Sequence, residues 1–457
     1  MSTIAAISTA TGNGGIGIIR MSGKNCFEIL NKIFIPINKD SEKIKGYTMK
    51  FGHIVNPETN EKIDEVLVSF FISPKSYTTE NMCEINSHGG IIVEKKILEL
   101  CLRNGAELAE PGEFTKRAFL NGRVDLAQAE SVIDLINSKT DNEAKASINQ
   151  LEGKLSKKIR IIRDDLLDLM ADIEANIDYP EYDIEDVTNM KINTVLNKVK
   201  LDLMNLSDSF EDGKILKEGV KTIIIGKPNA GKSSLLNTIL NEERAIVSEF
   251  AGTTRDTIEE FVNIKGVPLK LIDTAGIRKT EDKIEEIGVN RAIKLSEDAD
   301  LIIAIFDASK KLDSEDLEIL NIVNNKKSII LLNKIDLGDI NLEKNEQIEK
   351  VCENIIKISA KNGNGIEELF TCIEKLFNSK EISLNDGVII TNIRHKNQID
   401  KAINSVEEAI NSNENCMPID IVSIPIKQIL ADLSSITGED VSEDIINEIF
   451  SKFCLGK

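Results

Sequence analysis

A glycine-rich loop directly after an apolar segment is the feature that most constrains this sequence. Residues 226–233 read Gly-Lys-Pro-Asn-Ala-Gly-Lys-Ser, and the preceding Thr222–Ile225 has the composition of a buried strand. In a P-loop of this pattern, backbone N–H groups cradle phosphate oxygens at a helix N-terminus, the lysine reaches the β- and γ-phosphates, and the hydroxyl holds Mg²⁺. We therefore expect a bound nucleotide, contacted by Asn229, Ala230, Gly231, Lys232, Ser233 and Ser234.

Three further short motifs follow this loop, each after an apolar, strand-like segment. Asp273-Thr274-Ala275-Gly276 matches an element in which an aspartate supports Mg²⁺ and a glycine amide senses the γ-phosphate. Asn333-Lys334-Ile335-Asp336 ends in an aspartate that can pair with the two N–H donors of guanine. Ser359-Ala360-Lys361 fits the loop behind the base. Each motif alone is often an ordinary turn, but in this order and spacing they predict a GTPase.

A switch loop is expected between the P-loop and the Asp273 motif. Gly252–Asp256 occupies this place, and Thr254 is the expected second protein ligand of Mg²⁺. Ras-type enzymes place a glutamine after the Asp-x-x-Gly motif to orient water, whereas this chain has Ile277, so the catalytic polar group must come from elsewhere. Asn229 has two interpretations: it is a turn residue, or it coordinates a monovalent cation beside the phosphates.

The pattern of apolar residues changes along the chain and divides it into four parts. Residues 1–121 mix strand-like runs with a helix and predict an α+β domain, and residues 122–218 are helical. Residues 219–380 alternate buried strands with helices, which is typical of a parallel α/β sheet, and residues 381–457 return to helices. The sequence therefore predicts a multidomain protein in which an α/β P-loop GTPase domain is inserted into an all-α helical domain.

The helical part contains one strongly periodic stretch. Apolar residues recur at three- and four-residue steps from Leu151 to Ile177, which predicts one long amphipathic helix ended by Pro180. Further helices are expected at 192–210, 396–412, 425–436 and 441–453.

Composition excludes several classes of protein. No apolar run approaches the length of about 18 residues that a membrane span needs, and no export leader is evident. The seven cysteines have no regular spacing, which argues against a disulfide framework or a zinc site and favours the cytoplasm. With 56 basic and 76 acidic residues the net charge is −20, so the chain as a whole is not a general nucleic-acid binder. Contact with RNA would need a local patch of basic residues or a partner protein with a basic surface.

Motifs outside the nucleotide loops are similar to those of one family. They are Gly14–Gly23, Ser87–Gly90, Pro111–Phe114, Arg117–Asn121, Asp125–Glu130 and the terminal Cys454–Lys457. Together with the inserted nucleotide domain, they resemble the MnmE (TrmE) family of tRNA-modifying GTPases over essentially the whole chain.

The resemblance implies partners and a reaction. Members of the family form a homodimer through their N-terminal domains and work with a flavin-binding protein, MnmG (GidA), in a heterotetramer. The expected reaction adds a carboxymethylaminomethyl-type group to carbon-5 of the wobble uridine of certain tRNAs. The expected one-carbon donor is 5-formyl- or 5,10-methylene-tetrahydrofolate. GTP hydrolysis would be stimulated by K⁺ and by dimerisation of the GTPase domains, without an external arginine finger.

The resemblance also assigns roles to residues of the nucleotide domain. Asn229 would bind K⁺ through its side chain, and Ser233 and Thr254 would bind Mg²⁺. Backbone carbonyls would complete the K⁺ site, from Ser248, Phe250 and Thr253. Glu285 would help to orient the attacking water, although the sequence alone would make it an ordinary solvated charge on a helix.

For the folate derivative, the matching positions are Arg20, Glu84, Arg123 and Lys457. Arg123 stands where the family usually has lysine. The positive charge is kept, but the guanidinium of arginine differs in shape from the ammonium of lysine. From the residues alone, Arg20 and Glu84 are plain strand-end charges. Cys454 would take part in the substrate chemistry, with an ordinary tail cysteine as the alternative.

The sequence also contains a glycine pattern that resembles a dinucleotide fingerprint. Gly12, Gly14 and Gly17 form a G-x-G-x-x-G pattern, but Ile16–Met21 after them is strand-like, whereas a dinucleotide fingerprint opens a helix, so a tight turn is expected. His88, beside two glycines, is also expected to shape a turn. The alternative function is a ribosome-assembly GTPase without one-carbon chemistry, although such proteins carry a compact basic RNA-binding domain and this chain is acidic.

Overall fold

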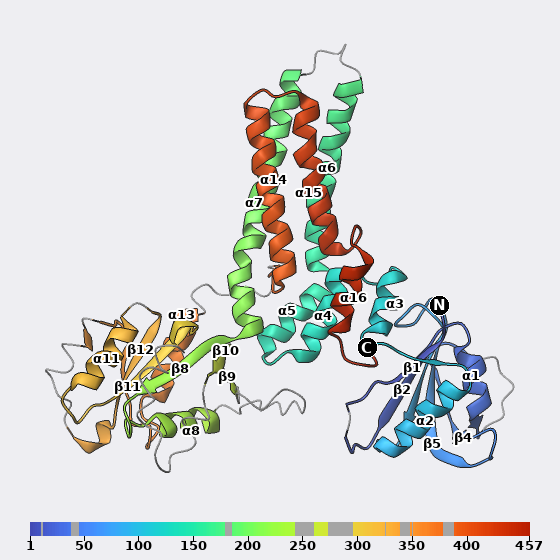
Figure 1. The fold of residues 1–457 in the computed structure, drawn as a ribbon, viewed down its shortest axis with the longest axis horizontal. Helices are drawn as coiled ribbons and strands as arrows, with labels where there is room; N and C mark the ends of the chain where they lie inside the picture. The colour runs from blue at the N-terminus through green and yellow to red at the C-terminus, as the bar shows by residue number, and fades with distance from the viewer. Residues whose placement is uncertain are drawn as a thin grey trace. The chain divides into compact units, whose positions relative to one another are not determined.

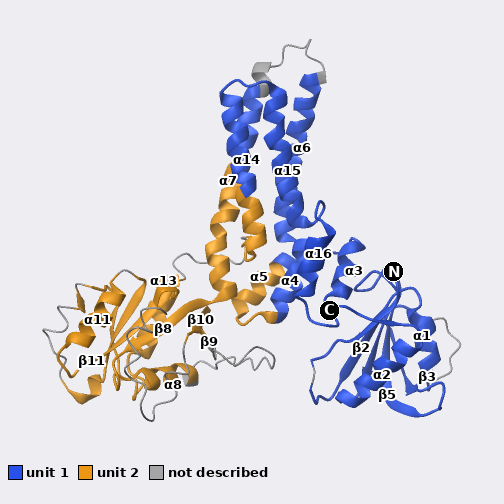
Figure 2. Ribbon diagram, in the orientation of Figure 1, with its two compact units in different colours: residues 1–136, 150–199, 401–457 blue, residues 137–149, 200–400 orange. Residues whose placement is uncertain are grey.

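The computed structural model describes the chain except for residues 11, 38–44, 179–184, 243–259, 273–295, 325, 339–347, 350 and 378–387. The described residues divide into two compact units (Figure 2). Unit 1 comprises residues 1–136, 150–199 and 401–457, and unit 2 comprises residues 137–149 and 200–400. Among the described helices, none is long and apolar enough to cross a membrane.

Unit 1 begins with a seven-stranded sheet in the order β3-β4-β5-β6-β2-β1-β7 (Figure 1). Neighbouring strands are antiparallel except β1 and β7, which are parallel. The strands are β1 Ile4–Ile7, β2 Gly17–Ser22, β3 Phe34–Pro36, β4 Thr48–Val55, β5 Lys62–Phe71, β6 Met82–Ser87 and β7 Glu107–Leu108. Because side chains alternate between the faces of a strand, Ile19 and Met21 enter the core while Arg20 between them faces away from it.

Two helices, α1 (Cys26–Ile33) and α2 (Ile91–Arg103), cover the buried face of this sheet. Their apolar residues join those of the strands in one core, including Leu30 and Ile97. The strand β2 follows the Gly12–Gly17 turn directly, as the sequence predicts, so this glycine pattern opens no helix.

The rest of unit 1 is helical. Its elements are α3 Glu113–Leu120, α4 Leu126–Asn137, part of α5 Asp141–Leu151, α6 Lys154–Asp178, the first half of α7 Glu185–Glu218, most of α14 Ile393–Glu414, α15 Ile419–Thr437 and α16 Glu443–Ser451. Long helices pack side by side: Lys198 of α7 pairs with Asp165 of α6 at 2.6 Å, and Lys427 of α15 pairs with Glu174 of α6 at 3.6 Å. The buried stripe of α6 has the predicted helical period and consists of Leu155, Ile159, Ile162, Leu166, Leu169 and Ile173.

Several helix boundaries differ from the prediction, and α7 (Glu185–Glu218) is much longer than the expected helix 192–210. Leu151 ends α5 and does not belong to α6, because Gly153 adopts a left-handed conformation (φ 79°) that interrupts the helix without breaking the apolar period. Pro425 lies inside α15 and not at its start, since α15 begins at Ile419. A proline in a helix removes one backbone hydrogen bond, but burial of the apolar face of α15 maintains the helix.

Unit 2 contains a six-stranded sheet in the order β13-β12-β11-β8-β10-β9. All neighbouring strands are parallel except β9, which is antiparallel to β10. The strands are β8 Val220–Gly226, β9 Glu260–Ile264, β10 Val267–Leu271, β11 Leu301–Asp307, β12 Ser328–Asn333 and β13 Ile355–Lys357. Helices α8 (Lys232–Glu242) and α13 (Ile366–Phe377) contribute to one core, and α11 (Ser314–Val323) contributes to another. The predicted mixed α/β organisation is therefore present.

The two ends of the inserted α/β segment lie next to each other. The chain leaves α7 at Glu218 and enters β8 at Val220, and it returns through Ile390 to α14. The Ile390 N–H donates to Ser209 Oγ at 3.1 Å, and a Cβ on Gly213 would lie 2.1 Å from the Ile390 carbonyl oxygen. Glycine at position 213 therefore allows the returning segment to contact α7.

Candidate functional site

The parallel sheet of unit 2 brings three predicted motifs to one edge. Residues 226–233 follow β8, Asn333–Asp336 follow β12, and Ser359–Lys361 follow β13. Carboxyl ends of parallel strands point to the same edge, which is where α/β proteins bind ligands. Backbone geometry thus assembles motifs that lie more than a hundred residues apart in the sequence.

The P-loop has the backbone of a phosphate cradle. Gly226 and Gly231 have φ values of 158° and 112°, and Asn229 lies in the left-handed region at 59°. A Cβ on Gly226 would lie 2.6 Å from the Ile305 carbonyl oxygen, so β11 requires glycine there. Helix α8 begins at Lys232, which places its unpaired N–H groups at the loop.

Lys232 folds back over the loop. Its Nζ donates to the carbonyl oxygens of Gly226 at 2.7 Å and Lys227 at 2.9 Å. These contacts hold a positive charge where the phosphates of a P-loop nucleotide would lie. Ser233 follows at the second position of α8 and is half-buried. Ala230 is buried, and Ser234 is exposed.

Asn333 links the P-loop to the third motif. Its Nδ2 donates to the Ala230 carbonyl oxygen at 2.7 Å, and its Oδ1 accepts from the Ala360 N–H at 2.9 Å. A Cβ on Gly231 would lie 2.0 Å from the same Nδ2, so this contact also requires glycine at 231. The buried amide therefore fixes the spacing between the phosphate loop and the expected base loop.

The expected base-recognition residues form a small polar network. Ser359 Oγ donates to Asp336 Oδ1 at 2.6 Å, and this hydrogen bond lowers the pKa of Asp336. Lys334, which is left-handed (φ 69°), pairs with Asp307 at 2.8 Å. Burial raises the pKa of Asp307, but hydrogen bonds from Lys334 and Ser309 outweigh it and lower this pKa to about 2. Asp336 is thus an ionised acceptor, as pairing with guanine requires.

Two contacts of this site were not predicted from the sequence. Asp307 is the last residue of β11 and pairs with Lys334. Its only signal in the sequence is a charged residue at the end of an apolar run. Lys227 pairs with Asp313 and with Asp316 (3.2 Å), the two residues that form a capping box on α11. Partial burial lowers the pKa of Lys227, but these hydrogen bonds outweigh it and raise the pKa. The signal for this contact in the sequence is the three-residue spacing of Asp313 and Asp316, which is the spacing of a capping box.

Several predicted residues lie outside the described part of the chain. They are Ser248, Phe250, Thr253, Thr254, Asp273, Thr274, Ala275, Gly276 and Glu285. Their roles remain predictions.

A second polar cluster lies in unit 1. On adjacent strands β2 and β6, Arg20 donates from Nε (2.9 Å) and Nη2 (2.8 Å) to one oxygen of Glu84, Oε1. Both side chains are largely buried, with 14% and 19% exposure. The other carboxylate oxygen of Glu84 receives no hydrogen bond from the described residues. One acceptor on a charged, oriented group therefore remains available to a ligand.

The C-terminal tail completes this cluster. Arg20 Nη1 donates to the Gly456 carbonyl oxygen at 3.2 Å, and Ser8 Oγ donates to the same oxygen at 3.0 Å. Gly456 has φ 85°, and a Cβ there would lie 2.3 Å from the Ile7 carbonyl oxygen. The Phe114 N–H donates to the Lys457 carbonyl oxygen at 3.1 Å. Backbone contacts thus hold Lys457 close to Arg20.

Tyr77 joins the two candidate arginines. The guanidinium carbons of Arg20 and Arg123 lie 5.3 Å and 4.5 Å from the centre of its ring. Tyr77 Oη lies 2.9 Å from Thr115 Oγ1, which fixes the ring against α3. The structure therefore brings Arg20, Glu84, Arg123 and Lys457 to one region, whereas Tyr77 carries no sequence motif that would have indicated this position. Cys454, three residues before Lys457, is exposed.

His88 contacts the carboxylate of Asp64 in addition to lying beside the two glycines. It precedes the glycines that open α2, and its Nδ1 lies 2.7 Å from Asp64 Oδ1. Its backbone N–H donates to the other oxygen of Asp64 at 2.8 Å. Asp64 thus anchors this turn to β5.

A P-loop on β8, an Asn-Lys-x-Asp motif on β12 and a base loop on β13 define the class: this is a P-loop GTPase of the guanine-nucleotide type. Comparison with known proteins identifies the family. Residues 3–123 match the family described as "GTP-binding protein TrmE N-terminus", and residues 126–454 match "MnmE helical domain".

Relatives match along the full chain. The tRNA modification GTPase MnmE of Acetivibrio thermocellus is 53% identical, and that of Clostridioides difficile is 51% identical, each over 100% of this chain and 99% of the relative. A solved structure of Aquifex aeolicus Era bound to GDP and aluminium fluoride is 28% identical over 41% of this chain and 66% of that one, with a TM-score of 0.27.

The chain therefore belongs to the MnmE family of tRNA modification GTPases. It hydrolyses GTP, with Mg²⁺ as the metal of the family, and it acts in tRNA modification.

Proposed function

We propose that this protein is a K⁺-stimulated GTPase that works with a flavin-binding MnmG-type partner. Together they add a carboxymethylaminomethyl-type group to carbon-5 of the wobble uridine of certain tRNAs. A 5-formyl- or 5,10-methylene-tetrahydrofolate bound in unit 1 supplies the one-carbon unit. The observation that carries this proposal is the cluster of Arg20, Glu84, Tyr77 and the C-terminal tail. This cluster belongs to unit 1, whereas the nucleotide motifs belong to unit 2.

The chemistry of this cluster fits a reduced pterin. The pyrimidine end of a pterin presents neighbouring N–H donors, and a carboxylate with a free oxygen is their complement. Arg20 donates two hydrogen bonds to one oxygen of Glu84 and thereby fixes the orientation of this carboxylate. Tyr77 offers an aromatic ring beside this carboxylate, and Arg123 adds an exposed positive charge that suits the carboxylates of the folate tail. Lys457 and Arg123 are therefore proposed to hold the tail, and Arg20 and Glu84 the ring.

Cys454 is proposed to act in the substrate chemistry. It is exposed, and the Gly112 N–H donates to its carbonyl oxygen at 3.4 Å, so its backbone is held at the start of α3. A thiol in this position can approach a substrate that reaches the folate site.

In unit 2, the P-loop residues are proposed to hold the phosphates, with Lys232 on the β- and γ-phosphates and Ser233 on Mg²⁺. Asn229 is proposed as the side-chain ligand of K⁺, and its left-handed backbone is a conformation that a short amide side chain tolerates. Thr254 is proposed to bind Mg²⁺, as the family resemblance implies. The proposed K⁺ site is completed by backbone carbonyls of Ser248, Phe250 and Thr253. Glu285 is proposed to orient the attacking water.

A homodimer through the N-terminal sheet is also proposed. The face of this sheet that bears Arg20 also exposes large apolar side chains of β4 and β5: Met49 is 58% exposed, Phe51 45% and Leu67 44%. Apolar groups gathered on one sheet face are typical of a protein interface. A second copy would cover them beside the folate cluster.

The net charge of −20 supports the proposal that a partner protein contributes to tRNA binding. Binding to nucleic acid depends on phosphate contacts by Lys and Arg, which an acidic chain supplies only locally. A basic surface on the flavin-binding partner is proposed to provide the remaining contacts.

Mass spectrometry of tRNA nucleosides tests this function. We expect carboxymethylaminomethyl-type uridine to disappear from cells that lack the gene and to return with a plasmid copy, but not with Lys232→Ala or Cys454→Ser. GTP hydrolysis by the purified protein should be faster in KCl than in NaCl. Unchanged modified uridine in the deleted strain would refute the pathway and leave the GTPase assignment intact, and ribosome profiles would then test the assembly alternative.

A further inference from the structure

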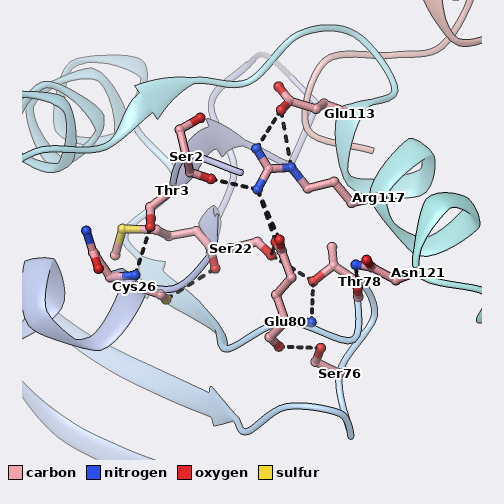
Figure 3. Close-up of polar contacts among 12 residues, drawn as sticks. Ser2, Thr3, Ser22, Cys26, Ser76, Thr78, Glu80, Glu113, Arg117 and Asn121 are labelled. Atoms are coloured by element: carbon pink, nitrogen blue, oxygen red, sulfur yellow. Dashed lines mark hydrogen bonds and ion pairs between the residues drawn. The ribbon is translucent and has the colours of Figure 1, made fainter. Parts of the chain in front are cut away.

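Arg117 is a deeply buried charge next to the candidate folate cluster, and its contacts join three segments of the chain. Its side chain on α3 is 4% exposed. Nη2 donates to Glu113 Oε1 at 2.7 Å, and Nη1 donates to Glu80 Oε2 at 3.1 Å and to the Ser2 carbonyl oxygen at 2.7 Å (Figure 3). One guanidinium therefore joins two carboxylates and the N-terminal strand segment.

Glu80 carries this contact into the loop between β5 and β6, residues 72–81, here called the Tyr77 loop. Ser22 Oγ of β2 donates to Glu80 Oε2 at 2.7 Å, and the same hydroxyl lies 2.7 Å from Thr78 Oγ1. The Thr78 carbonyl oxygen accepts from Asn121 Nδ2 at 2.7 Å. The contacts of Thr78 and Glu80 thus lead to α3 and to β2 (Figure 3).

The Tyr77 loop contains a strained residue. Thr79, between Thr78 and Glu80, has φ 63°, a left-handed conformation that is rare for a β-branched side chain. Such strain persists only where surrounding contacts over-determine it, and it gathers at ligand sites. The ion pair of Glu80 with Arg117 and its hydrogen bond from Ser22 are the adjacent contacts that can hold it.

These contacts act on the ring that joins the two candidate arginines. Tyr77 lies between Ser76, whose Oγ donates to the Glu80 carbonyl oxygen at 2.6 Å, and Thr78. Its ring faces Arg20 and Arg123. Thr115 holds the hydroxyl of Tyr77, and the backbone beside Tyr77 depends on Glu80 through Ser76. A shift of Glu80 would therefore displace the ring, although Arg117 donates to Glu80, Glu113 and Ser2 and not to Tyr77.

We propose that Arg117 is a positioning residue for the one-carbon ligand, and that it acts through Glu80 on the placement of Tyr77. This inference rests on the proposed folate site and adds a residue to it. Arg117 is not a ligand-binding residue, because its guanidinium is occupied by Glu80, Glu113 and Ser2. Lysine cannot replace it, since one ammonium cannot reproduce a planar fork that serves two carboxylates and a carbonyl.

Calorimetric binding of 5-formyl-tetrahydrofolate to the full-length protein tests the proposal. We expect Arg117→Lys to raise the Kd about tenfold, as loss of an orienting contact behind a ligand site commonly does. The matched control is Ile97→Val, which perturbs the core of the same domain on α2, away from the Tyr77 loop. The control should leave the Kd unchanged at a comparable loss of thermal stability.

A double substitution separates positioning from general destabilisation. Tyr77→Leu should also raise the Kd, and Arg117→Lys should add little in the Tyr77→Leu background, because both changes disturb one route. Ile97→Val combined with Tyr77→Leu should instead behave additively. If Arg117→Lys fails to fold, Glu80→Gln tests the same route, since it weakens the pair and keeps the shape.

Each outcome decides a different claim. If the wild type binds the folate and Arg117→Lys binds equally well, or if its effect is additive with Tyr77→Leu, the positioning role is refuted and the folate site stands. If the wild type does not bind the folate, the proposed one-carbon donor and this inference both fail.

Discussion

At the scale of single residues, the Asp307–Lys334 pair offers a pH-dependent test of the base loop. The folded-state pKa of Asp307 is lowered to about 2, below the ordinary value near 3.9. A lowered pKa contributes stability that is complete above about pH 4 and is lost as the pH falls towards 2, and a shift of this size corresponds to about 2 kcal/mol. We therefore expect Asp307→Asn to lower the free energy of unfolding by about that amount at neutral pH.

The measurement is urea unfolding of wild type and Asp307→Asn between about pH 7 and pH 3. The difference between them should shrink as the pH falls below about 4. Asp298→Asn, an exposed aspartate in the same unit, controls for the change in net charge. A difference that stays constant over the whole range would show that the charge of Asp307 does not support the loop.

Residue-scale prediction from sequence succeeded where the signal is local and failed where it is long-range. The P-loop and the Asn333 motif are contiguous, and their glycines and buried amide have the expected places. Asp307 and Tyr77 are recognised only when distant segments meet, because Lys334 and the two arginines of unit 1 give them their roles. No periodicity or spacing along the chain encodes those contacts.

At the scale of elements, the same distinction explains which strands were predicted. β11 and β12 are buried on both faces, so they appear as continuous apolar runs. β4 was not predicted, because Met49 and Phe51 expose apolar groups on its outer face while Gly52 lies on the buried one. Its alternation of apolar and polar residues is therefore obscured, although its pairing with β5 is regular over most of its length.

The hairpin β9–β10 provides the element-scale prediction. β9 begins just after the expected switch loop, and its Phe261 ring lies 3.2 Å from Nζ of Lys139, which precedes α5. Asn142 of α5 donates to the Gly266 carbonyl oxygen of the same hairpin at 3.4 Å. These two contacts connect the hairpin directly to α5. We expect Lys139→Ala to weaken the response of α5 to the nucleotide, with a loss of about 1 kcal/mol in the contact itself.

Hydrogen exchange measures that response. In the wild type, amides of α5 should exchange at different rates with GDP and with GDP–aluminium fluoride, and in Lys139→Ala this difference should shrink. Lys270→Ala is the matched control, because Lys270 lies 5.9 Å from the centre of the same ring but belongs to β10 and not to the segment that leads into α5. An unchanged difference in Lys139→Ala would exclude this contact as the connection.

At the scale of the whole molecule, two compact units with different ligand sites should unfold as two transitions. The nucleotide site belongs to unit 2, and the candidate folate site belongs to unit 1. A ligand stabilises only the unit that binds it, by about 2.7 kcal/mol at a concentration of 100 times its Kd. In calorimetry, GDP with Mg²⁺ should therefore raise one melting temperature and 5-formyl-tetrahydrofolate the other.

Lys232→Ala identifies the transitions. It should abolish the shift caused by GDP and preserve the shift caused by the folate, because Lys232 belongs to the P-loop of unit 2 and donates to the carbonyl oxygens of that loop. A single transition moved equally by both ligands would mean that the units unfold as one cooperative body. In that case nucleotide and folate would be linked energetically through the native state, and each should change the Kd of the other by the same factor.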